Sequence, residues 1–458
     1  MKKLRRVGIC LLVVILALSL FGCGAGNTNA QNSTANNNKE VTSATDTTTN
    51  TASGEVKKIT FWDYVWGPSE YLSAAKDLVE RFNSENTDNI EVTYQSISWS
   101  DGYEKFVAAI AANTPPDVST GGGFSQHQFA AMGQIMSLDS IIDEWTKDGS
   151  IDDFFPGLID NFKYNGEQIG IPWNVDSRAI YYRKDMFEQA GITTLPTTWD
   201  ELLEAGKKLS NDEHYGMIFA LQDNASDHPM QTFMASNGSG YFDESGNLAF
   251  DNEKNVQVLD FIEKMVTEGV IPKDVVSTTQ SAYEKMFFTG KVAIIIGATD
   301  FPEIARSEMG DDFVKNIGLL PPVKGYSGGG FSPMNPNAIM VFNKTKYPEE
   351  CKTFIKWFSN NNQSLWTDGK VGAMPARKSV FEVFNGDEFK TQFRDVLLSN
   401  AVTQTYPYPS AKPSMNGIES SGCLREALQE ALSTDKDHKA ILSDLQKNLQ
   451  ELVDDMDK

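Results

Sequence analysis

The sequence predicts an α/β fold in two lobes, each lobe a mostly parallel sheet flanked by helices. Strand-like and helix-like segments alternate from about residue 57, after an N-terminal leader and a polar segment. This alternation is typical of parallel sheets covered on both faces. The chain has 458 residues, of which about 400 follow the predicted signal peptide and the polar segment after it. That length exceeds what one hydrophobic core usually serves, so two lobes are expected.

The first lobe begins with two predicted strands, residues 57–62 and 90–94. A helix over 69–83 is predicted between them, because its apolar residues recur at helical spacing. A second helix over 103–112 leads to a third strand near 115–118. Ligands bind beyond the carboxyl ends of such strands, so the loops 62–66 and 121–125 become candidates for a binding site.

Three later segments are predicted to cross between the lobes. Residues 168–182 form a long, apolar, extended stretch, and residues 318–323 and 369–377 are shorter ones. A helix is predicted to start at Thr198, because Glu201 three residues later completes a capping box. Further along, 290–297 is predicted to be a buried strand, 349–360 a helix, and 422–456 an amphipathic helical stretch.

The leader indicates export. Residues 1–6 carry four positive charges, residues 7–21 are almost wholly apolar, and Cys23 follows Leu-Phe-Gly. The apolar run is about fifteen residues, short of the roughly twenty that span a bilayer. Residues 1–22 are therefore predicted to be a signal peptide. The 20–23 segment resembles the lipobox of bacterial lipoproteins, which implies lipidation of Cys23. An ordinary secretion signal with a chance cysteine is the alternative.

Residues 23–56 are predicted to be a disordered tether, because they are rich in Asn, Thr and Ser and nearly lack large apolar side chains. Without the four basic residues of the leader, 36 of the 40 Lys and Arg remain against 62 Asp and Glu, a formal charge of −26. That charge argues against nucleic acid as a partner.

Cys351 and Cys423 are expected to be two buried thiols, with one disulfide as the alternative.

Motifs for common catalytic sites are missing. The chain has no Gly-x-x-x-x-Gly-Lys phosphate loop and no His-Glu-x-x-His zinc motif. The acidic pairs at 152–153 and 311–312 are adjacent residues, a poor arrangement for a glycosidase acid and base. We therefore expect no catalytic residue, no cofactor and no metal.

An ordered set of motifs resembles a known family. Ile169-Gly-Ile-Pro-Trp-Asn-Val-Asp-Ser-Arg-Ala-Ile-Tyr-Tyr-Arg-Lys-Asp-Met-Phe-Glu-Gln-Ala-Gly191 is followed by 196–202, 287–297, 319–325 and 372–377 in matching order. The set is similar to the family 1 extracellular solute-binding proteins, the sugar-capturing subunits of ABC importers, which include the maltose-binding proteins. The resemblance implies a two-lobed periplasmic-binding-protein-like fold (type II) with three inter-lobe crossings. It places lobe 1 at 57–175 and 325–371, and lobe 2 at 176–324 and 372–458.

The resemblance also implies binding residues. Asp176 matches an acid of the first crossing that accepts hydrogen bonds from sugar hydroxyls. Phe124 and Ser125 match the loop after the third strand, and Asp223 matches a polar loop of the second lobe. Many members place a tryptophan after the strand that ends at residue 297, where this chain has Ala-Thr-Asp300. Asp300 is therefore expected to bond a hydroxyl or an ion instead of stacking on a sugar.

Other candidates come from the residue types that sugars need, namely aromatic faces for the C–H face of the ring and carboxylates or amides for the hydroxyls. Several could instead belong to the core, to the hinge or to a plain turn. These candidates are Trp62, Asp63, Trp66, Trp173, Asn237, Tyr241, Tyr406 and Tyr408.

The resulting hypothesis is a monomeric, lipid-anchored protein on the extracellular face of the cell membrane. It captures a sugar or oligosaccharide between its lobes and delivers it to the permease subunits of an ABC importer. One alternative is a cell-surface carbohydrate-active enzyme. Another is the same fold binding a polyol, a peptide or a metal chelate.

Overall fold

The computed structural model describes residues 55–223 and 225–457. The predicted signal peptide, Cys23 and most of the predicted tether lie outside these residues. The main sheet has ten strands. These are β1 (Lys57–Tyr64), β2 (Ile90–Ile97), β3 (Val118–Thr120), β6 (Ile171–Arg183), β7 (Tyr215–Ile218), β8 (Val292–Ala298), β9 (Ile317–Leu319), β10 (Ser332–Val341), β11 (Met374–Pro375) and β12 (Ala401–Val402). A separate hairpin pairs β4 (Lys163–Tyr164) with β5 (Glu167–Gln168).

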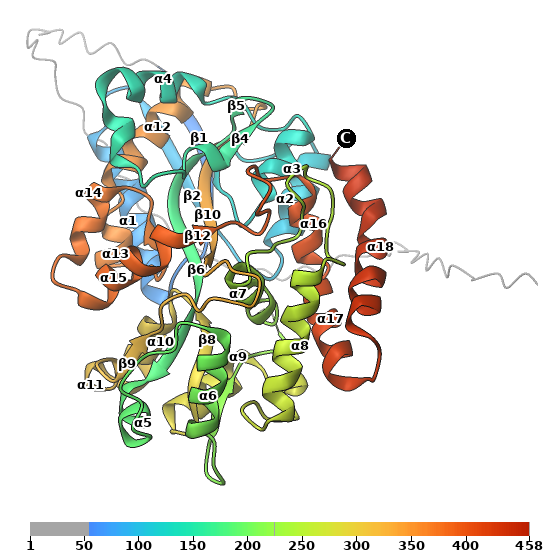
Figure 1. The fold of residues 1–458 in the computed structure, drawn as a ribbon. Coiled ribbons are helices and arrows are strands. Elements are labelled where there is room, and N and C mark those ends of the chain that lie inside the picture. Colours follow the sequence, from blue (N-terminus) through green and yellow to red (C-terminus); the bar gives the residue numbers. More distant parts are fainter. Residues whose placement is uncertain (1–54, 224, 458) are drawn as a thin grey trace, which may run out of the picture. The chain divides into compact units, whose positions relative to one another are not determined.

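The long strand β6 joins two groups of strands. The order along the main path is β2-β1-β3-β10-β6-β8-β7. Residues 171–177 of β6 pair with β10, and residues 178–182 pair with β8. Figure 1 shows β6 in green, running lengthwise between the two groups of strands. The predicted crossing at 168–182 is therefore confirmed as one continuous strand.

The other two crossings lie against the same strand. β9 pairs with the end of β6, and the chain then passes through residues 320–331 into β10. β11, inside the predicted crossing 369–377, pairs with residues 174 and 175 of β6. Pairing is parallel within β2-β1-β3 and between β7 and β8. β6 and β10 run antiparallel to each other, because they carry the chain in opposite directions.

Helices flank both ends of this sheet. The first part of the chain, residues 57–175, together with the segment after β10, contains α1 (Ser69–Glu85), α2 (Gly102–Ala111), α3 (Ser125–Ala131), α4 (Asp139–Asp148), α12 (Pro348–Asn361) and α13 (Ser364–Thr367). Those of the second part are α5 (Lys184–Gln189), α6 (Trp199–Leu209), α7 (His228–Ser236), α8 (Glu253–Thr267), α9 (Gln280–Phe288), α10 (Phe301–Met309) and α11 (Asp311–Val314). The C-terminal ones are α14 (Lys378–Phe381), α15 (Glu388–Gln392), α16 (Ser414–Ser420), α17 (Cys423–Ser433) and α18 (His438–Met456).

The amphipathic stretch predicted over 422–456 is two helices. α17 ends at Ser433, and the polar residues 434–437 separate it from α18. The carboxylate of Asp437 accepts a hydrogen bond from the backbone N–H of Ala440 at 2.9 Å and caps the second helix. Both helices contact α8 (Figure 1).

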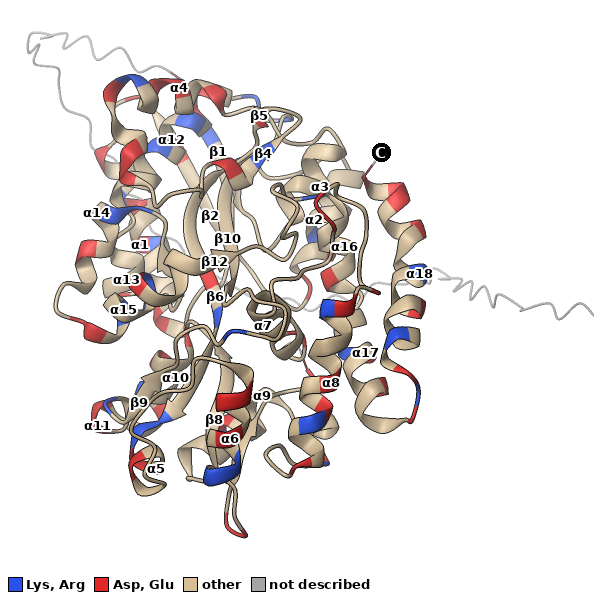
Figure 2. Ribbon diagram, in the orientation of Figure 1, with Lys and Arg blue, Asp and Glu red and all other residues tan. Residues whose placement is uncertain are grey.

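Most Lys, Arg, Asp and Glu residues lie on the helices and loops, and few lie on the strands (Figure 2).

The start of α6 confirms the predicted N-cap. Thr198 Oγ1 accepts a hydrogen bond from the backbone N–H of Glu201 at 3.3 Å. The carboxylate of Glu201 bonds back to the backbone N–H of Thr197 at 2.8 Å, one residue earlier than in a regular capping box.

Two separate large cores lie on the two sides of the shared strand. One contains side chains of β1, α1, α12 and the first part of β6. The other contains side chains of the second part of β6, of β8 and α6–α9, and of α17 and α18. The boundaries given above for the two lobes stay a prediction, which these two cores support.

Both cysteines of the described chain are buried and free, so the expectation of two thiols is confirmed over the disulfide. Burial raises the pKa of Cys351 and of Cys423 to about 12, which keeps both thiols protonated.

Candidate ligand-binding cleft

A cleft of about 1470 Å³ opens where the two groups of strands meet. Its lining comes from the end of β1, the loops after β2 and β3, the middle of β6 and β10, and the helices α7, α10 and α16. Backbone segments far apart in sequence therefore meet around the middle of β6. This position beyond the strand ends is where open α/β sheets bind ligands.

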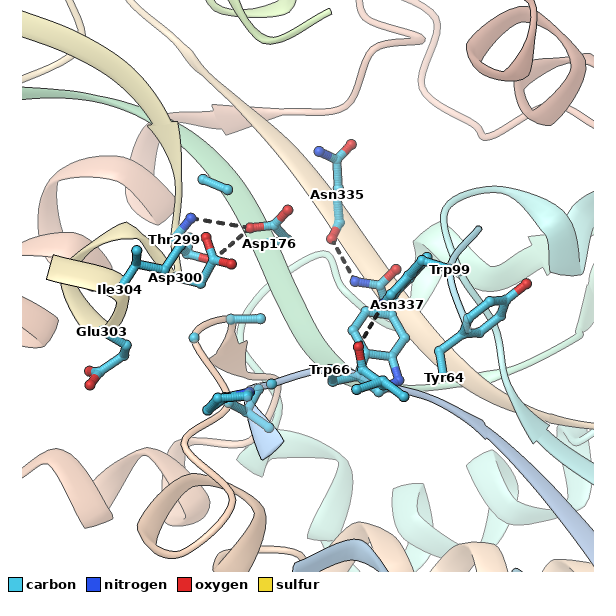
Figure 3. Close-up of a pocket in the computed structure, with 18 of the residues that line it drawn as sticks. Tyr64, Trp66, Trp99, Asp176, Thr299, Asp300, Glu303, Ile304, Asn335 and Asn337 are labelled. Atoms are coloured by element: carbon cyan, nitrogen blue, oxygen red, sulfur yellow. Dashed lines mark hydrogen bonds between the residues drawn. The ribbon is translucent and has the colours of Figure 1, made fainter. Parts of the chain in front are cut away.

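Aromatic rings form one wall of the cleft. The rings of Tyr64 and Trp99 stack with their centroids 4.4 Å apart. Trp66 meets Trp99 edge-on at 4.8 Å. Trp99 keeps half of its surface exposed, and its indole N–H donates to the carbonyl of Val65 at 2.6 Å. Figure 3 shows these three rings together at one end of the pocket. They offer apolar faces that a flat, partly apolar ligand could cover.

A buried carboxylate fixes this wall from behind. The hydroxyl of Thr120 donates to a carboxylate oxygen of Asp63 at 2.7 Å. The oxygen of this Thr120 hydroxyl also accepts two hydrogen bonds, from the indole N–H of Trp66 at 3.3 Å and from the backbone N–H of Tyr64 at 3.1 Å. The hydroxyl of Tyr71 donates to the second oxygen of Asp63 at 2.7 Å. Burial raises the pKa of Asp63 to about 7, although these hydrogen bonds oppose the shift. Asp63 therefore positions the wall without lining the cleft.

The floor of the cleft is the middle of β6. Asp176 forms an ion pair with the guanidinium of Arg178. Its other oxygen accepts from Thr299 Oγ1 at 2.6 Å, so the carboxylate links β6 to the loop after β8 (Figure 3). Burial alone would lower the pKa of Arg178. The charge and the hydrogen bond of Asp176 act in the opposite direction, and the net result is a pKa above the usual value.

Two asparagines of β10 complete the floor. Asn337 donates to Asn174 Oδ1 at 2.7 Å and to the carbonyl of Asn335 at 3.3 Å. Both asparagines line the cleft between the aromatic wall and Asp176 (Figure 3).

Three further carboxylates, Asp227, Asp300 and Glu419, line the cleft. Desolvation inside the cleft raises the pKa of Asp300 to about 6, although the residue keeps an exposed surface, and the charge of Asp176 adds to the shift. Burial raises the pKa of Asp227 to about 6, although Arg425 opposes it. Burial and the neighbouring Asp227 raise the pKa of Glu419 to about 8. A cleft lined by aromatic rings and by carboxylates can hold a ligand that has both apolar and hydrogen-donating faces.

Five of the predicted site residues line this cleft. They are Trp66, Ser125, Asp176, Asp223 and Asp300. Asp223 accepts hydrogen bonds from the backbone N–H groups of Ala225 and Gln280, which fixes its loop.

Four predicted residues of the first part lie behind the lining, because they pack against the core. Trp62 packs on Phe106, and Asp63 is buried as described above. Phe124 is buried in the core of the second part. Trp173 is 2% exposed and meets the ring of Trp66 edge-on at 5.1 Å, so it supports the wall.

The four remaining predicted residues also lie outside the lining. Asn237 is fully buried and its amide nitrogen donates to the carbonyl of Lys254 at 2.8 Å. Tyr241 packs on Phe250 in the core. Tyr406 packs on Phe331, and the ring of Tyr408 lies near the ammonium of Lys412. These side chains hold loops of the second part together.

Several lining residues escaped the sequence reasoning. Tyr64 ends β1 and lies inside the candidate loop 62–66, although it was not singled out, and Trp99 follows the end of β2, a signal that could have found it. Arg178 lies two residues after Asp176 and so projects from the same face of β6, a second usable signal. No local pattern marks Glu419, because α16 reaches the cleft only through the fold. Among the described residues, no cluster of His, Cys, Asp and Glu could hold a metal ion.

The same part of the chain contains no helix that is long and apolar enough to cross a membrane.

Comparison with known proteins agrees with this architecture. The profile of the bacterial extracellular solute-binding protein family matches residues 66–363. A sugar transporter from Arthrobacter chlorophenolicus, solved with bound laminaribiose, is 31% identical with a TM-score of 0.75, over 86% of this chain and 99% of that one.

Curated relatives carry similar names. An arabinooligosaccharide-binding protein from Halalkalibacterium halodurans is 29% identical over 53% of this chain, and the match spans 56% of that protein's length. One of the same name from Bacillus subtilis is 21% identical over 84% of this chain and 83% of its own length.

The buried carboxylate of Asp63 makes stability depend on pH. Its pKa is about 7 in the folded chain and near the ordinary 3.8 when unfolded. Between these values the folded state binds more protons, so this group's contribution is most favourable at low pH and is lost as pH rises to about 7. We expect Asp63→Asn to gain stability relative to the wild type as pH rises through this window, by at most roughly 1.4 kcal/mol for each step of one in pH.

Chemical denaturation at several pH values measures this difference. Asp212→Asn, at an exposed loop position, is the control and should follow the wild-type curve. Parallel curves for Asp63→Asn and the wild type would contradict the role assigned to burial.

The pair in the middle of β6 predicts a second effect. Asp176→Asn leaves Arg178, whose side chain is 14% exposed, without its ion-pair partner. We expect the free energy of unfolding to fall by about 1–3 kcal/mol, less than for a fully buried pair. The double variant Asp176→Asn/Arg178→Met should recover part of this loss, because no charge is then left uncompensated. An unchanged free energy in the single variant would show that the pair contributes nothing.

Proposed function

This chain belongs to the bacterial extracellular solute-binding protein family, and we propose that it captures a sugar or oligosaccharide in the cleft and delivers it to the permease subunits of an ABC importer. The observation that carries the proposal is the aromatic wall that faces carboxylates and amides across one cleft. The names of the similar proteins, which refer to arabinooligosaccharides and laminaribiose, support it.

The cleft supplies both kinds of contact that sugars need. The face of Trp66 or Trp99 covers the C–H face of a pyranose or furanose ring. Asn335 and Asp176 lie on the floor beside these rings, where hydroxyls at the ring edge would reach them (Figure 3). Placement of apolar and polar groups on different sides of one cleft orients a ring and selects its hydroxyl pattern.

Binding is coupled to movement of the two lobes in this proposal. The lining comes from both sides of the shared strand β6, so a ligand that contacts both walls favours the closed arrangement. The permease then recognises the closed, loaded form. The protein acts as a monomer and releases the ligand unchanged, because it binds and does not catalyse.

The aromatic wall gives the sharpest test. Sugars and oligosaccharides are screened by thermal shift, and the sugar that raises the melting temperature is titrated by calorimetry. A ligand at a hundredfold excess over its Kd stabilises the folded state by about 2.7 kcal/mol. Trp66→Ala should weaken binding roughly tenfold through lost stacking. Tyr215→Ala removes an exposed aromatic ring outside the cleft and should bind as the wild type does.

Two results would count against the proposal. Equal affinity of the Trp66→Ala variant and the wild type would remove the aromatic wall from the site. Recovery of cleaved or modified sugar after incubation with the protein alone would favour a carbohydrate-active enzyme.

The leader supports a lipid anchor at the outer face of the cell membrane. Cys23 follows an apolar segment and precedes a polar stretch that ends where β1 begins. The tether gives the cleft reach from the membrane surface toward the permease.

Cys23→Ser tests the anchor. The wild type should fractionate with membranes and carry lipid detectable by mass spectrometry of its N-terminal peptide. The variant should appear in the medium or retain its leader. A variant that is processed and membrane-bound like the wild type would exclude lipidation at Cys23.

A further inference from the structure

Two helices from different parts of the protein contact each other beside the cleft. α3 packs with the first part, because the ring of Phe129 stacks on the ring of Tyr103 in α2 with centroids 6.4 Å apart. α16 packs with the second part, because Met415 and Ile418 belong to its core. The two helices nevertheless lie side by side (Figure 1). The two parts of the protein therefore touch each other directly, and not only through the strands that cross between them.

One side chain of α3 bonds to residues of both parts. The carboxamide oxygen of Gln128 accepts a hydrogen bond from the side-chain amide of Asn416 in α16 at 2.8 Å. The amide nitrogen of Gln128 donates to the hydroxyl of Tyr103 at 2.8 Å. Tyr103 and Asn416 line the cleft, whereas Gln128 lies outside the lining. The carboxamide of Gln128 thus ties a lining residue of the first part to a lining residue of the second.

The loop before α3 makes two further contacts with the second part. Phe124 follows β3 of the first part, yet its ring is 4% exposed and belongs to the core of the second part. Gly123 approaches α16 so closely that a Cβ atom at this position would lie 3.3 Å from a carboxylate oxygen of Glu419. An apolar contact, a close backbone approach and a hydrogen bond therefore join the two parts within the segment 123–128.

The hydrogen bond between Gln128 and Asn416 depends on the distance between the two parts. Hydrogen bonds of this type have donor–acceptor distances of about 2.7–3.2 Å, so a separation of α3 from α16 by roughly 1 Å more would break it. The bond therefore exists only while the two parts lie as close together as they do here. A ligand that contacts residues of both parts needs the same closed arrangement.

We propose that Gln128 is a positioning residue for ligand capture, whose bond to Asn416 stabilises the closed arrangement and raises the affinity of the cleft for every ligand by the same factor. This inference rests on the proposed function, because it concerns how the cleft retains what it captures. The apparent affinity of a ligand is its affinity for the competent arrangement multiplied by the fraction of protein in that arrangement. Gln128 lies outside the lining, so it changes this fraction without selecting between ligands.

Gln128→Met tests the inference, because it keeps the length of the side chain and removes both hydrogen bonds. Calorimetric titration should show an affinity about two- to tenfold below that of the wild type, the usual net effect of one hydrogen bond. The factor should be the same for each sugar that the wild type binds, and for the shorter and longer oligomers of that sugar. The loss should appear in the dissociation rate measured by stopped-flow fluorescence, because the bond forms after the ligand has entered.

The matched control is Gln134→Met. Gln134 also lies in the first part and outside the lining, and its amide nitrogen donates to the carbonyl of Met132 at 3.1 Å. This substitution removes a hydrogen bond that does not reach the second part. The control variant should therefore bind each sugar as the wild type does.

A double-variant cycle connects the effect to the bond between the two helices. Asn416→Leu removes the partner of Gln128 and changes a residue that lines the cleft, so its own effect on affinity includes any contact with the ligand. When Gln128→Met is added to Asn416→Leu, the affinity should change by less than about twofold, because the bond is already absent.

The outcomes separate this inference from the proposed function. Equal affinity of Gln128→Met and the wild type would overturn the inference and leave the proposed function standing. Factors that differ from one sugar to another, or a full effect of Gln128→Met in the Asn416→Leu background, would also overturn it. A wild type that binds no sugar would remove the proposed function and this inference together.

Discussion

One strand shared by two groups of strands is the constraint on which the rest of the structure depends. β6 leaves its pairing with β10 at Ser177 and enters its pairing with β8 at Arg178 without a break. Each lobe therefore takes its orientation from the backbone of a single segment. The cleft lies over that segment, because the loops at the strand ends of both groups converge there.

Charge at this junction follows from its geometry. The residues of β6 on either side are mostly apolar and buried, but the point of transfer between the two groups of strands faces the cleft and not a core. A charged side chain is tolerated there only with a partner, which Asp176 and Arg178 provide for each other. Thr299 adds a bond from the loop after β8, so the pair also ties the two parts together. Asp176 thus has a structural task besides any contact with ligand.

The sequence was informative where short-range patterns decide the structure, and silent where packing decides. The apolar run at 168–182 predicted the shared strand, and Thr198 with Glu201 predicted a helix start. The residues that face the cleft were harder to predict. Successive side chains of a strand point to opposite faces of the sheet, and only the packing of neighbouring elements decides which face is buried. Asp63 thus turned inward and Tyr64 toward the cleft. Glu419 and Asn335 reach the site through segments distant in sequence, which no local motif records.

The continuous strand also restricts how such a protein can vary through insertion and deletion. Side chains of a strand alternate with a period of two, so one added residue in the middle of β6 would reverse every side chain beyond it. The buried Tyr181 would exchange places with its neighbours, and the pairing with β8 and β9 would lose its register. Surface loops can lengthen at little cost, since their closure entropy grows slowly. Inherited length changes should therefore accumulate in loops and spare this strand.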